Sequence, residues 1–371
     1  MINGYRRNSK AAGIRNKLLV LYTVNCSAFI AQSIGRKLRQ AGLDVDVAGN
    51  ESCYDNQSMV DQLLRLSIHP NVGAVLVVGH GCEFIQADKI AEFAKHHGRE
   101  AEMIYGQQLG TREGIENGVK LGYELAGKLK KVQKEVVSLN GMAIGLSISA
   151  CDETVFSCLP LLEAVLTSLM SQGAAILLAD HYLCGLHLDE AEKNSPDAAE
   201  LKMKVERCFT PHLSGFFKEK KTAVEAYLMK YLAGCVKLAQ IPQGPGIWFS
   251  DALQDYGVMK GPLNGGVAGE LMQYAGNGAV LNLMLTGRGT PVSSVVTPTL
   301  IMTGNRNTKE RMREDVDWFI DPSQETTAQI LDLIARTMSG ALTCPEKNGQ
   351  DHALLFQNAQ NRRSCDGCME K

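Results

Sequence analysis

The chain has 371 residues, of which 45% are hydrophobic, and this length exceeds the roughly 250–300 residues that one core usually organises. Its 38 lysines and arginines nearly balance 40 aspartates and glutamates, so it lacks the basic field with which proteins bind nucleic acid or an anionic membrane. We therefore expect two domains, and a small molecule or a protein as partner rather than nucleic acid or a membrane.

Eleven cysteines are spread along the chain. The first residues lack the apolar segment of a signal peptide, and no run approaches the roughly 20 apolar residues of a membrane span. We therefore expect a cytoplasmic protein with reduced thiols, in which each cysteine is buried filler, a metal ligand or a nucleophile.

Short apolar, β-branched runs alternate with longer stretches of helical period, which predicts an α/β fold of two Rossmann-like parts with mainly parallel sheets covered by helices. Residues 72–78 are apolar on both faces, as in a strand covered on both sides. In the first part we expect strands at 18–24, 72–78 and 101–105, and helices at 27–41, 55–68, 86–97 and 111–136.

A lysine-rich segment followed by Leu139-Asn140-Gly141 marks a boundary, so we expect a first domain at 1–139 and a second at 140–342. A helical insertion is expected near 189–233, and a polar tail at 343–371. In the second domain we expect strands at 142–149, 174–179, 279–285 and 299–303, and helices at 155–171 and 325–338.

Three cysteines of the first part lie where predicted strands give way to helices. They are Cys26, Cys53 and Cys82. The carboxyl ends of parallel strands are where such sheets bind ligands, and a helix amino end favours the thiolate. A single cysteine in such a place is more often buried filler, but three of them and the adjacent Glu83 favour a shared site.

Two further strand ends in the second part carry polar residues. Asp152 follows the first strand, where an aspartate is commonly a helix N-cap. Residues 286–290 form a glycine-rich turn in which Arg288 can grip a carboxylate with two hydrogen bonds. The chain has no phosphate-binding glycine motif. Cys365 and Cys368 form a C-x-x-C pair without a second pair to complete a zinc site, which leaves a redox role as an alternative.

An ordered set of short motifs resembles the UxaA family, which contains the catalytic region of altronate and galactarate dehydratases. The motifs span nearly the whole chain. They lie at residues 4–7, 13–16, 23–26, 69–72, 81–83, 107–114, 245–246, 257–261, 286–289 and 303–315.

The resemblance implies a lyase that removes water from a sugar acid to give an enol, and then a keto acid. It also implies a divalent metal, Fe²⁺ for the dehydratases, which would hold the negative charge that develops on the substrate. On this basis Cys82, Glu83 and Asp152 are the candidate catalytic residues, and Cys26, Cys53 and Cys82 the candidate metal ligands. The candidate residues for binding the substrate, a small hydroxy acid, are Arg7, Arg15, Asn16, Thr286 and Arg288.

Several polar motifs of the family are altered here. The family's Cys-Gly-Gly-Ser-Asp element is Ile148-Ser149-Ala150-Cys151-Asp152, and its His-Gly element before the second cysteine is replaced around Asn50. Two alternatives therefore accompany the dehydratase: a sulfolactate sulfo-lyase-like subunit, and a non-catalytic ligand-binding paralogue. The small SAF domain of many relatives is missing from the chain, so we expect a separate small subunit as partner, and also a homo-oligomer.

Overall fold

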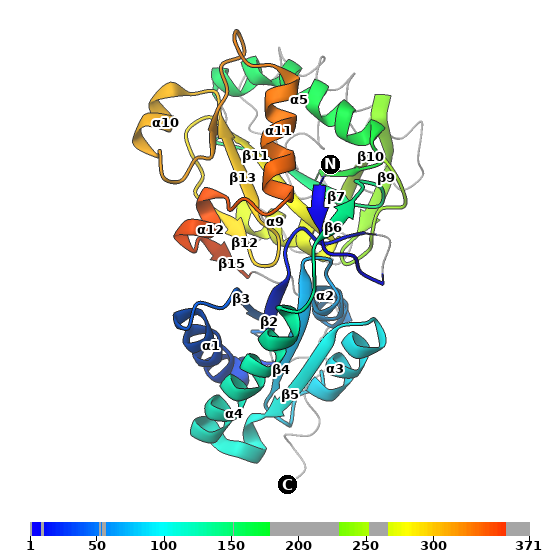
Figure 1. Cartoon of the computed structure of the whole chain (residues 1–371), viewed down its shortest axis with the longest axis vertical. Coiled ribbons are helices and arrows are strands. Elements are labelled where there is room, and N and C mark those ends of the chain that lie inside the picture. Colours follow the sequence, from blue (N-terminus) through cyan, green and yellow to red (C-terminus); the bar gives the residue numbers. More distant parts are fainter. Residues whose placement is uncertain are drawn as a thin grey trace.

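The computed structural model describes residues 2–8, 11–51, 53, 57–150, 152–178, 230–251 and 266–353. Most of the predicted insertion at 189–233, the end of the predicted tail, and the Cys365/Cys368 pair lie outside the described residues. Figure 1 shows two α/β domains arranged along the long axis of the molecule. The predicted fold class, mainly parallel sheets flanked by helices, is confirmed.

The first domain is built on a parallel four-stranded sheet in the order β3-β2-β4-β5. Successive residues of β2 point to opposite faces, and both faces are buried: Leu18 and Val20 pack with α1 and α4, whereas Leu19 and Leu21 pack with α2 and α3. This two-sided burial explains the unbroken apolar runs in the sequence. The strands are β2 (Lys17–Tyr22), β3 (Val45–Gly49), β4 (Val72–Gly79) and β5 (Glu100–Tyr105), and the helices α1 (Asn25–Gln40), α2 (Gln57–Ser67), α3 (Ala87–His96) and α4 (Gly106–Leu129).

The helix predicted at 111–136 differs from α4 at both ends. The structure begins α4 at Gly106 and includes a break at Gly110, whose φ of 74° suits glycine. The helix ends at Leu129, where the lysine-rich segment begins. Residues Glu135–Val137 then form β6, which pairs antiparallel with β1 (Ile2–Gly4). Ile2 and Ile14 are buried in the core of the second domain, so the first residues of the chain pack outside the domain predicted for them.

The second domain contains a parallel seven-stranded sheet in the order β14-β13-β11-β7-β8-β10-β9. Helices α5 and α11 cover one face, and α9 covers the other. The strands are β7 (Ala143–Ser149), β8 (Ala175–Leu178), β9 (Leu232–Lys237), β10 (Gly246–Asp251), β11 (Ala279–Thr286), β13 (Thr299–Thr303) and β14 (Trp318–Phe319). The helices are α5 (Glu153–Ser171), α9 (Gly266–Gly276), α10 (Arg306–Arg311), α11 (Thr327–Met338) and α12 (Cys344–Asn348).

Residues 343–353, expected to start a polar tail, belong to the second domain. Thr343 caps α12, and β15 (Asp351–His352) pairs with β12 (Ser293–Ser294).

Helix α5 is the one described helix long and apolar enough to cross a membrane by length and composition. From the sequence we expect no such stretch. Seven of its residues, including Val155 and Leu166, are buried in the domain core. Its apolar character is therefore explained by packing inside the domain.

The two sheets meet at the amino ends of their strands. His69 Nε2 lies 3.0 Å from the Ala279 carbonyl oxygen, and Asn71 Nδ2 donates to the carbonyl oxygens of Val280 and Val296, both at 2.8 Å. His69 and Asn71 immediately precede β4, while Ala279 begins β11. Both strands have eight residues, so each extends about 25 Å from this junction. The carboxyl ends of the two sheets therefore lie at opposite ends of the molecule.

Candidate functional site

The second sheet reverses its strand order between β7 and β11. From β7 the chain passes to β8 and later to β9 and β10 on one side, and then returns to build β11, β13 and β14 on the other side. In open α/β sheets, ligands bind outside the carboxyl ends of the strands at such a reversal. A ligand site is therefore expected at the turns that follow β7, β11 and β13.

These turns are tied to one another. After β7, Ala150 adopts a φ of 44°, an uncommon value for a residue with a side chain. Its carbonyl oxygen accepts a hydrogen bond from the Arg288 amide at 3.1 Å. After β13, Asn305 caps α10 and also donates from Nδ2 to Asp152 Oδ2 at 2.8 Å. Residues from three neighbouring strand ends thus contribute to a single cluster.

Asp152 is the N-cap of α5. Its Oδ1 accepts hydrogen bonds from the Thr154 amide at 2.9 Å and the Thr154 hydroxyl at 2.5 Å, and its Oδ2 accepts the bond from Asn305. Burial by itself would raise the pKa of Asp152, but hydrogen bonds from Thr154, Asn305 and Val155 outweigh it, so the pKa lies below its ordinary value. A carboxylate with a lowered pKa is a weak base. This geometry is that of a carboxylate that positions Asn305, and it is unsuited to a general base that removes a proton.

The glycine-rich turn after β11 has a steric reason. A Cβ on Gly287 would lie 2.5–2.8 Å from the carboxyl atoms of Asp152, and one on Gly289 would lie 2.1 Å from Met312 Sδ. Gly289 also has a φ of 93°. The turn can approach both Asp152 and α10 because neither glycine has a side chain.

The Thr286 side chain holds this turn through hydrogen bonds. Its buried hydroxyl accepts a hydrogen bond from the Gly289 amide at 3.2 Å and lies 3.3 Å from Thr290 Oγ1. Thr290 in turn accepts a bond from Ser149 Oγ at 2.9 Å. The predicted contact of Thr286 with substrate stays a prediction. What the geometry shows is a hydroxyl network that holds the Arg288 turn in place.

A cavity of about 370 Å³ opens above this cluster, lined by Arg288, Asn305, Thr308, Arg311 and Met312. None of these described lining residues is acidic, and Arg288 is exposed. Within the described part of the chain, neither arginine forms an ion pair with a carboxylate. A cavity with two cations and a side-chain amide can bind a small carboxylate through charge-assisted hydrogen bonds.

Arg288 is predicted from its glycine-rich turn, whereas Thr308 and Arg311 are not among the residues predicted from the sequence. They lie three residues apart, one turn of helix, just after Asn305. A search for polar residues in the first helical turns after each predicted strand would have found them.

The first sheet has its own reversal, between β2 and β4, and Glu83 fills it. The Glu83 side chain is buried, and its carboxylate accepts hydrogen bonds from Thr23 Oγ1 at 2.7 Å and from the amides of His80 and Gly81 at 2.9 and 2.6 Å. These contacts hold the loop that follows β4. In this structure the crevice where a ligand anion would bind is occupied by the chain's own carboxylate.

The three predicted metal ligands lie at this end of the first domain. Cys26 and Cys53 are exposed, and Cys82 is half-buried. Among the described residues, no group of three or more histidine, cysteine, aspartate or glutamate side chains is arranged to hold a metal ion. Asp152 belongs to the opposite end of the molecule. The described donors therefore do not form the predicted iron site.

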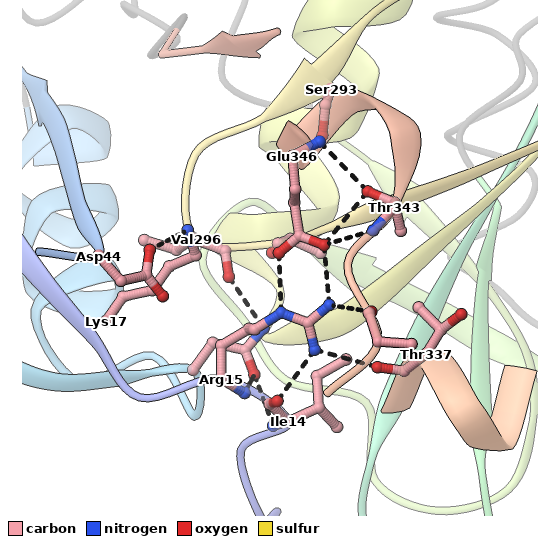
Figure 2. Close-up of polar contacts among 12 residues, drawn as sticks. Ile14, Arg15, Lys17, Asp44, Ser293, Val296, Thr337, Thr343 and Glu346 are labelled. Atoms are coloured by element: carbon pink, nitrogen blue, oxygen red, sulfur yellow. Dashed lines mark hydrogen bonds and ion pairs between the residues drawn. The ribbon is translucent and has the colours of Figure 1, made fainter. Parts of the chain in front are cut away.

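Arg15 lies at the junction between the domains (Figure 2). Arg7 and Asn16 lie beside it, and Arg7 Nη2 donates to the Arg15 carbonyl at 3.2 Å. Arg15 Nε and Nη2 donate to Glu346 at 2.7 and 2.8 Å. Its Nη1 donates to the carbonyl oxygens of Ile14 and Thr337, and the second N–H of Nη2 donates to the carbonyl oxygen of Ala341. All five N–H donors of the guanidinium are thus used, so Arg15 has none left for a substrate.

Arg7 and Asn16 are engaged in the same way. Arg7 Nε donates to the Pro70 carbonyl at 2.8 Å, and Nη2 donates to Asn16 Oδ1 at 2.9 Å. Asn16 Nδ2 donates to the Leu129 carbonyl at 3.1 Å. Burial lowers the pKa of Arg7 to about 10, with a further contribution from the Arg99 charge. Both residues hold segments of the junction together, away from the carboxyl ends of both sheets.

Two family models match the chain. The second domain of D-galactarate dehydratase/altronate hydrolase matches residues 4–130, and the C-terminal domain of D-galactarate/altronate dehydratase matches residues 223–361. The chain belongs to the galactarate and altronate dehydratase family. The resemblance noted from the sequence motifs is thereby confirmed.

Three relatives align over nearly the whole chain at low identity. The (2R)-sulfolactate sulfo-lyase subunit beta of Chromohalobacter salexigens is 22% identical, covering 95% of this chain and 96% of the relative. The altronate dehydratases of Bacillus subtilis and Escherichia coli are each 25% identical, covering 96% and 95% of this chain and 77% of each relative. Two of these relatives are thus dehydratases, and the third is a subunit of a sulfo-lyase.

Proposed function

We propose that the chain is a hydro-lyase that removes water from a small hydroxy acid bound in the Arg288 cavity. The observation that carries the proposal is a cavity of about 370 Å³, lined by two arginines and by no described acidic residue, at the strand-order reversal of the second sheet. Its size falls within the range of about 300–1,000 Å³ that is typical of small-molecule sites. Membership of a dehydratase family supports the reaction class.

The reaction breaks two bonds of the substrate. The carbon next to the carboxylate loses a proton, the neighbouring carbon loses its hydroxyl group, and the two leave together as water. The remaining enol then becomes a keto group. Negative charge builds up on the carboxylate as the proton leaves, so a cation held against that carboxylate lowers the barrier. Arg288 can supply this charge through two parallel hydrogen bonds.

Asp152 and Asn305 contribute by position in this proposal. The carboxylate of Asp152 holds the amide of Asn305, which lines the cavity. Asn305 Oδ1 also accepts the amide of Thr308 at 3.2 Å. The side chain is thus fixed on two sides, and a fixed donor loses little entropy when it binds substrate.

The family comparison also supports a second candidate, expulsion of sulfite from sulfolactate. The sulfo-lyase subunit has nearly the length of this chain, since 96% of it is covered, compared with 77% of the altronate dehydratases. Sulfolactate carries a carboxylate that the same cavity would bind. A non-catalytic paralogue, the third alternative, would bind the acid in this cavity without converting it.

The test is to incubate the purified chain with aldonates, aldarates and sulfolactate and to assay keto-acid and sulfite. We expect one acid to be converted, and Arg288→Gln to lower kcat/KM by about tenfold or more, the usual effect of losing a charge-assisted hydrogen bond. Arg313→Gln is the matched control, because Arg313 is an exposed arginine close in sequence that does not line the cavity. Equal effects of the two variants would contradict the assignment.

The predicted Fe²⁺, the small SAF-domain subunit and the homo-oligomer stay part of the proposal. The name of the sulfo-lyase relative, a subunit beta, supports a multi-subunit assembly. Metal analysis of protein purified without air tests the iron, and conversion assays with and without added Fe²⁺ test whether it is needed. Native mass spectrometry of the chain, alone and with a small subunit, tests the assembly.

A further inference from the structure

We propose that Arg311 is a second anion-binding residue of the cavity, and that the substrate therefore carries two anionic groups. The inference rests on the proposed function, because it concerns the acid bound beside Arg288. It selects hydroxy acids with two carboxylates, or with a carboxylate and a sulfonate, over acids with a single carboxylate.

The packing of α10 sets the direction of Arg311. Thr308 Oγ1 donates to the Gly287 carbonyl at 2.7 Å, so this face of α10 lies against the Arg288 turn. Residues three apart on a helix share a face. Arg311 therefore projects on the same side as Thr308, and both line the cavity together with Arg288.

The other cations of α10 are already engaged. The Arg306 guanidinium lies over the Phe319 ring at 5.3 Å, and Lys309 Nζ donates to the Val316 carbonyl. Arg311 uses only Nε, which donates to the Asn307 carbonyl of its own helix at 3.3 Å. Its terminal NH₂ groups have no assigned protein partner in the described chain, and they are the ones that bind anions in parallel pairs.

Among the described residues, no carboxylate forms an ion pair with either arginine. The Asp152 carboxylate, which holds Asn305 of the cavity lining, already accepts bonds from Asn305 and Thr154. A ligand with one negative charge would leave one arginine without a partner. A ligand with two would satisfy both, and electrostatic complementarity of this kind sets specificity.

The experiment measures binding of three acids to the full chain by isothermal titration calorimetry: galactarate with two carboxylates, sulfolactate with a carboxylate and a sulfonate, and altronate with one carboxylate. We expect at least one of the two dianions to bind about tenfold or more tightly than altronate. Arg311→Gln should remove this difference by weakening only the dianion. Arg311→Lys should retain much of it, Arg288→Gln should weaken all bound acids, and Arg313→Gln should change none.

The proposal is overturned if altronate binds as tightly as both dianions, if Arg311→Gln affects all acids equally or none, or if no acid binds. Turnover of the same acids separates this inference from the proposed function. The expected charge dependence without keto-acid or sulfite production refutes the lyase and leaves the two-anion site standing. Conversion of altronate alone, by contrast, supports the lyase and refutes the two-anion site.

Discussion

Replacing Arg15 with methionine should destabilise the protein strongly, because Arg15 joins the two domains through a buried ion pair. The Arg15 and Glu346 side chains are 5% and 12% exposed. Without the guanidinium, the bonds that the Glu346 carboxylate keeps within the described residues come from Thr343, at 2.9 Å from the amide and 3.2 Å from the hydroxyl. The carbonyl oxygens of Thr337 and Ala341 lose a donor as well. Removing one partner of a buried pair typically costs about 3–5 kcal/mol.

The destabilisation should depend on pH. Burial alone would raise the pKa of Glu346, but Arg15 outweighs it, so the folded pKa lies below its ordinary value. The stabilisation from the pair is therefore present above the unfolded pKa of about 4.3 and is lost as the pH falls through the lower, folded pKa. The difference in unfolding free energy between wild type and Arg15→Met should shrink in acid.

Urea unfolding at several pH values measures this difference. The control is Arg6→Met, which removes the exposed Arg6–Glu135 pair and should cost less than about 1 kcal/mol. The double variant Arg15→Met with Glu346→Met should recover part of the loss, because no charge is then left buried without a partner. If Arg15→Met costs no more than Arg6→Met, or if its cost does not change with pH, the reasoning is refuted.

Three further predictions test the junction and the cavity. Burial lowers the pKa of His69 to about 3, so unfolding takes up a proton between about pH 6.5 and 3. In this range the group should lower the free energy of unfolding by about 1.4 kcal/mol for each pH unit of acidification. A His69→Gln variant whose urea midpoint keeps the wild-type dependence on pH would argue against this. Gly287→Ala would displace the Asp152 carboxylate and should abolish acid binding in calorimetry, whereas Gly127→Ala, in open space on α4, should leave binding intact and stabilise by roughly 0.5–1 kcal/mol. Cys82→Ser lies at the far end of the molecule and should leave acid binding at the Arg288 cavity unchanged; a tenfold loss would place the binding site in the first domain.

The sequence was sufficient for the fold class and for most elements of the first domain. Strands such as β2 and β4 are apolar on both faces. This pattern predicts burial on both sides of the sheet without any knowledge of which elements pack against it. It was less reliable for the helix predicted at 111–136. Its end depends on the pairing of β6 with β1, which lies more than a hundred residues away in the chain.

For the site, the sequence pointed to strand ends in both domains but could not say which of them lie together. Asp152 and Arg288 are brought together by neighbouring strands, and both were recognised. Cys82 and Glu83 occupy an equivalent position on another sheet, and only the contacts of His69 and Asn71 with β11 show that this sheet points the other way.

For Arg15, too, the sequence and the tertiary structure determine different properties. Its motif, residues 13–16, is one of the ordered set that resembles the family, and that inference needs no coordinates because it depends only on residue types in order. Whether its donors bind a substrate or groups of the chain itself depends on which residues fold against it, and Glu346, which takes two of them, is 331 positions away. The sequence by itself thus determined the family and most elements of the first domain, since both follow from local patterns. Tertiary structure alone decided which charged groups are already paired and which, like Arg288 and Arg311, remain available to a ligand.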